Sequence, residues 1–194
     1  MKGILFKPQL IPLVLSGQKT MTRRAIKPQP ETDSVTWGCI GGQGFGFIFG
    51  TKVFKPRYQP GEIVYLKETW GSNMVKGWEK CGKIFYRVDM PDHKTIPETY
   101  GRPWRSPLMM PEWASRCKLQ ILNVKVDRLQ EITEEDVISE GCGIQPLHPD
   151  DEYIRAIEDF ACLWDSINKE YPWSSNPRVF VYEFKPIPSS DEGK

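Results

Sequence analysis

The densest group of chemically useful side chains in this sequence lies near its start, in residues 17–24, Gly-Gln-Lys-Thr-Met-Thr-Arg-Arg. The segment contains three cations and two hydroxyl groups, namely Lys19, Thr20, Thr22, Arg23 and Arg24. Guanidinium and ammonium groups bind phosphate, and a hydroxyl becomes a nucleophile when a neighbouring base takes its proton. One hypothesis is therefore an anion or nucleotide site, in which Arg23 and Arg24 meet phosphate and Lys19 lies in the groove. The simpler interpretation is a solvated basic strand.

The charges of the chain are segregated along its length, although the 194 residues carry a net charge of only +1. Residues 1–30 hold six basic and no acidic side chains, whereas residues 127–170 hold 13 acidic and three basic ones, a balance of −10. The acidic run is most simply the solvated face of two helices, and the basic end is where an anionic or nucleic-acid partner is expected.

A second candidate group lies around Glu68 and Trp70, at the end of a strongly predicted strand. A carboxylate that points inward there could accept a hydrogen bond from the edge of a nucleobase, whereas one that points outward would simply face solvent. Trp70 and Trp113 could stack on a base or form the wall of a pocket, and the alternative for both is a place in the hydrophobic core.

Metal and cofactor chemistry have little support in the sequence. The only histidines are His93 and His148, and the five cysteines form no Cys-x-x-Cys pair. The glycine-rich segment 38–50 lacks the Gly-Lys-Ser/Thr of a phosphate-binding loop, so it is read as a hairpin or as a lid over the groove. We therefore expect neither a metal ion nor a cofactor.

The elements that must position these residues are mostly strands. Strands are expected at 2–6, 47–54, 58–70, 83–88, 118–126 and 178–184, and helices at 7–16, 133–140 and 153–168. Residues 19–24 should be extended or turning. The helices do not alternate with the strands one by one, which excludes a doubly wound sheet and favours an α+β fold on a small mixed sheet or barrel. The length predicts one domain over residues 1–185, followed by a disordered tail at 186–194.

The apolar N-terminal stretch is broken by Lys7, Pro8 and Pro12, which argues against a signal peptide and against a membrane span. We therefore expect a cytoplasmic protein with no membrane partner. The oligomeric state does not follow from the sequence.

Several segments together resemble the ASCH domain, a β-barrel family of the PUA-like superfamily, and in particular its larger phage- and prophage-associated branch. The segments are Gly-x-Lys-Thr-x-Thr-Arg at 17–23, Pro-Gly-Glu-Ile-Val-Tyr-Leu-Lys-Glu-Thr-Trp at 60–70, Met-Pro-Glu-Trp-Ala-Ser-Arg at 110–116, Arg-Leu-Gln-Glu-Ile-Thr-Glu-Glu-Asp at 128–136 with Glu140-Gly141, and Trp173 to Asn176-Pro177. The resemblance implies a mixed β-barrel with helices packed around its rim.

The resemblance also implies a function. Small bacterial members of the family are amidohydrolases of N4-acetylcytidine, and their lysine, threonine and glutamate correspond here to Lys19, Thr22 and Glu140. Thr22 would be the nucleophile, Lys19 its base, and Glu140 would tune the lysine or transfer a proton. The remaining residues expected to contact RNA or a modified nucleoside are Thr20, Arg23, Arg24, Glu68, Trp70, Trp113 and Arg116. A non-catalytic RNA-binding module and an RNA-cleaving enzyme that uses Lys19 and Glu140 are the alternatives.

Overall fold

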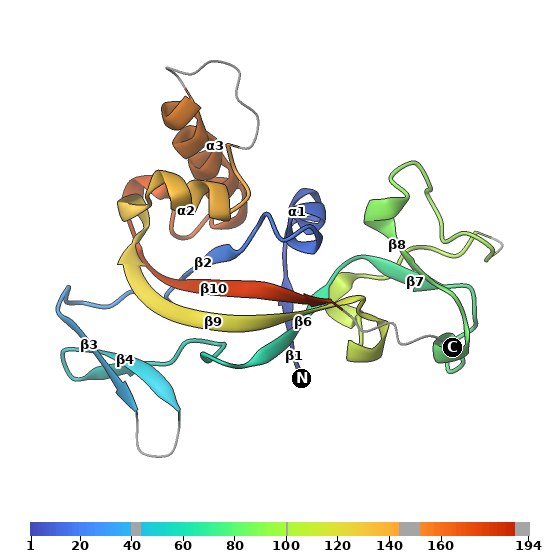
Figure 1. The fold of residues 1–194 in the computed structure, drawn as a ribbon, viewed down its shortest axis with the longest axis horizontal. Coiled ribbons are helices and arrows are strands. Elements are labelled where there is room, and N and C mark those ends of the chain that lie inside the picture. Colours follow the sequence, from blue (N-terminus) through green and yellow to red (C-terminus); the bar gives the residue numbers. More distant parts are fainter. Residues whose placement is uncertain (40–43, 100, 144–151, 189–194) are drawn as a thin grey trace. The chain divides into compact units, whose positions relative to one another are not determined.

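The computed structural model describes residues 1–39, 44–99, 101–143 and 152–188 (Figure 1). The chain folds into two compact units, and each draws on segments that are far apart in the sequence. Unit 1 comprises residues 1–17, 63–120 and 186–194, and unit 2 comprises residues 18–62 and 121–185. The prediction of one domain over residues 1–185 stays a prediction, and the two units are described here one at a time.

Unit 1 is organised around the pairing of β1 (Lys2–Leu5) with β6 (Ile63–Lys67). These strands run parallel, with Ile4 opposite Leu66, and β6 also pairs antiparallel with the start of β9 (Cys117–Arg128). Parallel strands need a crossover connection, and in this chain residues 6–62 provide it. A short 3-10 turn (η1, Pro8–Leu10) leads into α1 (Ile11–Leu15), and Gly17 ends it at φ 76°, a conformation that glycine adopts at little cost.

The rest of unit 1 is a small antiparallel pair surrounded by short turns. Strands β7 (Trp70–Ser72) and β8 (Ile84–Tyr86) form the pair, and Trp70 packs with Met110 and Ala114 in a local core. The 3-10 turns of this region are η2 (Glu79–Cys81), η3 (Arg87–Asp89), η4 (Pro107–Met109) and η5 (Glu112–Ala114).

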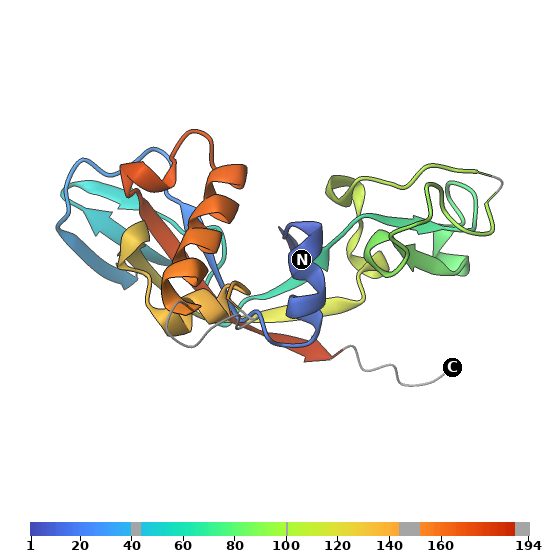
Figure 2. The same cartoon turned by 90° about the horizontal axis from the view of Figure 1, so that it is seen from above.

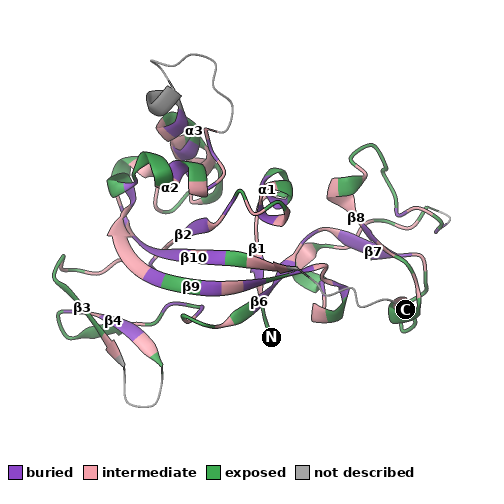
Figure 3. Ribbon diagram, viewed as in Figure 1, coloured by how far each residue is buried: buried purple, intermediate pink, exposed green. Residues whose placement is uncertain are grey.

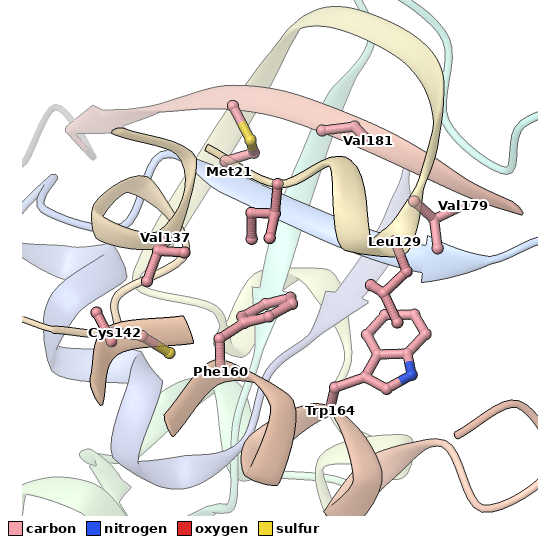
Figure 4. Close-up of a cluster of buried hydrophobic side chains, with 10 residues drawn as sticks. Met21, Leu129, Val137, Cys142, Phe160, Trp164, Val179 and Val181 are labelled. Atoms are coloured by element: carbon pink, nitrogen blue, oxygen red, sulfur yellow. The ribbon is translucent and has the colours of Figure 1, made fainter. Parts of the chain in front are cut away.

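Unit 2 contains an antiparallel pair, β2 (Met21–Ala25) with β10 (Arg178–Pro188), whose two faces have different partners. Met21, Val179 and Val181 share one face because side chains alternate along a strand. That face packs against α2 (Glu134–Ser139) and α3 (Glu152–Ile167). Val137 of α2 and Ala156, Phe160 and Trp164 of α3 join the strand residues in one buried cluster, which Leu129, Ile132 and Cys142 complete from neighbouring segments (Figure 4). This cluster is the main core of unit 2. Two further 3-10 turns flank it, η6 (Leu129–Glu131) and η7 (Trp173–Ser175).

The opposite face of the β2–β10 pair meets a three-stranded antiparallel sheet of β3 (Val35–Cys39), β4 (Phe45–Phe49) and β5 (Lys52–Phe54). The rings of Phe47 and Phe180 join the two sheets, with centroids 5.7 Å apart. Within this unit the helices and the β3–β5 sheet therefore cover opposite faces of the central pair, which Figure 2 shows from above. Figure 3 shows the buried residues of the central strands in purple.

The α+β prediction is confirmed. Unit 1 contains the paired strands β1, β6 and the start of β9 and the two-stranded β7–β8 sheet, and unit 2 contains the β10–β2 pair and the three-stranded β3-β4-β5 sheet. No closed barrel is found among the described residues, so the barrel with helices around its rim stays a prediction. Within the same described residues, no helix is long and apolar enough to cross a membrane.

The element predictions differ from the structure in several places. Strand β3 was not predicted, and the strand expected at 58–70 is limited to β6, with β7 starting separately at Trp70. The single strand expected at 47–54 is two strands, β4 and β5, because Gly50 takes φ 58° and turns the chain between them. Strand β10 continues to Pro188, three residues into the tail expected at 186–194. The hairpin or lid expected at 38–50 lies partly outside the described residues, at 40–43.

Candidate active site

Lys19 is the most unusual side chain of unit 2, because it is a lysine of which only 1% is exposed. Its Nζ atom donates hydrogen bonds to Oε2 of Glu140 at 2.7 Å, to the Glu140 carbonyl oxygen at 2.6 Å and to the Met21 carbonyl oxygen at 2.7 Å. An ammonium group has three N–H donors, so all of them are used. The structure therefore brings together Lys19 and Glu140, as the sequence analysis predicted.

Backbone contacts hold the two residues in place. The Thr20 N–H donates to the carbonyl oxygen of Ser139 at 2.9 Å, and the Thr20 carbonyl accepts from the Phe184 N–H at 2.8 Å. Thr20 thus ties the segment before β2 to the end of α2 and to β10. Its expected role as a ligand contact is not tested by these bonds, which involve only its backbone.

Helix α2 fixes the position of Glu140. Thr133 caps the start of the helix by accepting a hydrogen bond from the Asp136 N–H at 3.2 Å, and Glu140 is its last half-helical residue. Gly141 follows at φ 86°, which ends the helix directly after Glu140.

Arg23 extends the pair into a network of four charges. Its guanidinium donates to Oε1 of Glu140 at 3.2 Å and to Oδ2 of Asp136. Two cations and two carboxylates therefore compensate one another, and Arg23 is itself 4% exposed. The structure places Arg23 inside unit 2 against acidic side chains, and its contact with phosphate stays a prediction.

The environment changes the pKa of Lys19. Burial lowers this pKa from its ordinary value because it disfavours the ammonium form, and the Glu140 carboxylate opposes the effect. The three accepting oxygens nevertheless require three N–H groups, so the resting state is the ammonium. A lysine in this environment can release its proton to the carboxylate beside it more readily than a surface lysine could.

Thr22 and Arg24 lie on the other face of β2, because the strand alternates and Met21 and Arg23 face the helices. Thr22 is 4% exposed and is paired with Tyr182 across the ladder. Within the described part of the chain, its hydroxyl makes no hydrogen bond with Lys19 or Glu140. Arg24 is half-buried, and burial lowers its pKa while Tyr58 and Glu140 oppose the shift.

The Glu68 group belongs to unit 1 and is treated as a separate site. Glu68 is 2% exposed and accepts two hydrogen bonds from Arg116, at 2.9 and 2.8 Å. Arg116 also pairs with Asp89 at 2.6 Å and lies 4.1 Å from the ring centroid of Tyr86. Burial raises the pKa of Glu68, and Arg116 opposes that shift.

The two tryptophans of unit 1 contact each other edge to face, with ring centroids 5.7 Å apart. Trp70 is 2% exposed and belongs to the local core, as its alternative interpretation predicted. Trp113 is 39% exposed, and Nζ of Lys80 lies 5.8 Å from its ring centroid.

The sequence analysis missed Asp136 as a partner of Arg23. Asp136 and Glu140 are four residues apart, so they lie on the same side of α2. Lys19 and Arg23 are also four residues apart. This matched spacing of two cations and two carboxylates is a signal that could have identified the network from the sequence.

The described residues offer no metal site. Among the described residues, no group of three or more histidine, cysteine or acidic side chains could hold a metal ion. Comparison with family models, with curated proteins and with solved structures found no match to this chain.

Proposed function

We propose that this chain is a PUA-like protein of the ASCH type that recognises RNA or a modified nucleoside, and that it hydrolyses the N4-acyl amide of a modified cytidine. The observation that carries the proposal is the buried Lys19–Glu140 pair, with 2.7 Å between Nζ and Oε2. Burying charged groups is costly, and ionisable groups with shifted pKa values concentrate at functional sites. Supporting it, Thr22 lies three residues after Lys19, where the resemblance requires a nucleophile.

In the proposed mechanism, Lys19 first transfers a proton to Glu140 and becomes a neutral amine. Thr22 lies on the opposite face of β2, so substrate binding has to shift this segment until the Thr22 hydroxyl meets the amine. The amine then removes the hydroxyl proton as the oxygen attacks the acyl carbon. Lys19 then donates that proton to N4 of the cytosine, the C–N4 bond breaks, and an acyl ester of Thr22 remains. Water hydrolyses the ester with Lys19 again as the base, the proton passes from Lys19 to the Thr22 oxygen, and the acyl group leaves as the carboxylic acid. Glu140 then returns its proton to Lys19, which restores the ion pair.

The test is to incubate the protein with N4-acetylcytidine and to measure free cytidine by liquid chromatography. We expect turnover by the unchanged protein and its loss in Lys19→Met, Thr22→Val and Glu140→Gln. Lys27→Met is the matched control, since Lys27 lies in the same basic segment but pairs with Glu170 at the surface. The absence of cytidine, or turnover that survives in Lys19→Met, would contradict the proposal.

A second candidate function is a non-catalytic RNA-binding module. It is favoured by the saturation of Lys19, whose three donors all bind atoms of the protein. A third reading, RNA cleavage with Lys19 and Glu140 as acid and base, uses the same pair. Incubation with single-stranded RNA distinguishes the binding module from the RNA-cleaving enzyme, because cleavage yields shorter fragments and binding alone yields only a complex.

A further inference from the structure

Unit 1 contains a pocket of about 330 Å³. Its apolar wall consists of Pro8, Ile11, Pro12, Val88 and Pro91. Glu68 and Arg87 are its charged residues. Pockets of this size that combine apolar walls with a few polar groups are typical of small-molecule sites.

Glu68 has hydrogen-bonding capacity beyond its bonds to Arg116. Its two oxygens receive Nε and Nη2 of Arg116, and each carboxylate oxygen can accept more than one hydrogen bond. Because Arg116 holds the carboxylate in place, Glu68 is a fixed acceptor that can take one further N–H group from a ligand.

Arg87 supplies the opposite charge to the same pocket. One of its Nη atoms donates to the carbonyl oxygen of Met90, and its guanidinium lies 5.8 Å from the ring centroid of Trp104. Across the residues that the structure describes, no acidic side chain forms an ion pair with Arg87. Its charge therefore remains for an anionic group.

We propose that this pocket binds a flat heteroaromatic ring that carries an N–H or amino donor and an anionic substituent, as a nucleoside monophosphate does. The donor binds the Glu68 carboxylate, the proline and aliphatic side chains pack on the ring, and the anion binds Arg87. The site is independent of the proposed hydrolase function, since all these residues lie in unit 1 and Lys19 and Glu140 lie in unit 2.

Calorimetric titration with AMP, CMP, GMP and UMP, and with the corresponding nucleosides, tests the proposal. We expect at least one monophosphate to bind, and to bind about tenfold more tightly than its nucleoside, as for a hydrogen bond to a charged group. Arg87→Gln should reduce the affinity of the monophosphate to that of the nucleoside. Lys83→Gln is the matched control, because it removes another cation of unit 1 that pairs with Glu98 at the surface.

Two further variants keep the test decisive. Val88→Trp should fill the pocket and abolish binding while the melting temperature shows that the protein is folded. Lys27→Met changes a surface cation of the basic segment in unit 2 and should bind the monophosphate normally, which shows that the pocket does not depend on that segment. Failure of every monophosphate to bind, binding that survives Val88→Trp, or loss of binding in Lys27→Met would overturn the proposal. If a trinucleotide displaces the bound monophosphate, the natural ligand is part of an RNA strand. If it does not, the natural ligand is a free nucleotide, and either result supports the pocket.

Discussion

Lys19 and Glu140 are 121 positions apart in the sequence, and their side chains form an ion pair from which water is almost excluded. The pair is tolerable because each charge has further partners: two carbonyl oxygens for the ammonium and Arg23 for the carboxylate. Removing one member of such a network leaves the other charges buried without compensation. The resulting loss of folding free energy is larger than the net stabilisation that the ion pair itself contributes.

Lys19→Met should therefore destabilise the protein by about 3–5 kcal/mol, as is typical when one partner of a buried pair is removed. The Glu140 carboxylate would lose its closest cation and two carbonyl groups would lose their donor. Urea unfolding of Lys19→Met, with Lys27→Met as the exposed control, measures the difference. Equal midpoints for the two variants would show that the network contributes little.

At the scale of elements, short helix α2 determines the position of both carboxylates of the network. It has only six residues, so its stability depends on its ends and on packing against β2 and α3. Thr133 provides the N-terminal cap, and Val137 anchors the helix in the core of unit 2.

Thr133→Ala should lower the free energy of unfolding by about 1 kcal/mol, because the Asp136 N–H loses its acceptor. Thr133→Ser keeps an oxygen at that position and should restore most of the loss. Chemical denaturation of the three proteins measures both effects. If serine is as destabilising as alanine, the hydroxyl does not act as a cap.

A second element-scale prediction concerns Asp33, in the connection between β2 and β3. Its carboxylate accepts hydrogen bonds from Arg178, at 3.1 Å, and from Arg128. These contacts lower the pKa of Asp33, with Arg178 as the main cause. A lowered pKa in the folded state means that the stabilisation is complete above the ordinary pKa of an aspartate and is lost as the pH falls through the folded value.

Asp33→Asn should therefore lower the melting temperature at pH 7, and the difference from the unchanged protein should shrink as the pH falls below about 4. Melting curves of both proteins between pH 7 and pH 2.5 provide the measurement. If the difference in melting temperature is the same at every pH, the effect comes from the shape of the Asp33 side chain and not from its charge.

At the scale of the whole molecule, the segregation of charge along the sequence is partly cancelled in space. Of the six cations in residues 1–30, Lys19 and Arg23 pair with Glu140 and Asp136, and Lys27 pairs with Glu170. Acidic residues of the run 127–170 are therefore partners of the basic segment. The sequence analysis expected this run to form the solvated face of two helices, but Asp136 and Glu140 pair with Lys19 and Arg23 instead. The basic segment offers fewer charges to a nucleic acid than its composition suggests.

Binding of single-stranded RNA should accordingly depend only moderately on salt. The ion pairs of Lys19, Arg23 and Lys27 occupy three of the six cations of residues 1–30. The slope of log Kobs against log[salt] should therefore be no steeper than about −2, against about −4 if all six contacted phosphate. Fluorescence anisotropy at several salt concentrations measures the slope, and Lys7→Gln should reduce it by about 0.7 if Lys7 contacts phosphate. A slope of −4 or steeper would contradict this account.

Much of the local structure can be predicted from the sequence, because it depends on neighbouring residues. The strand at residues 63–67, the Thr133 cap and the ends of the helices at Gly17 and Gly141 follow from alternation, a capping hydroxyl and glycine at positive φ. The turn at Gly50 and the continuation of β10 to Pro188 depend instead on pairing with other strands, which local patterns do not contain.

By itself, the sequence predicted an α+β protein and identified the basic segment near residue 19 as its densest group of cations and hydroxyls. Only the tertiary structure decided which of those groups meet. It placed Lys19 and Arg23 on the side of β2 that faces α2, and Thr22 and Arg24 on the other side, because a one-residue change in strand phase exchanges the faces. It also assigned Glu68 and Arg116 to a different compact unit, because long-range strand pairing and not sequence distance determines which segments fold together.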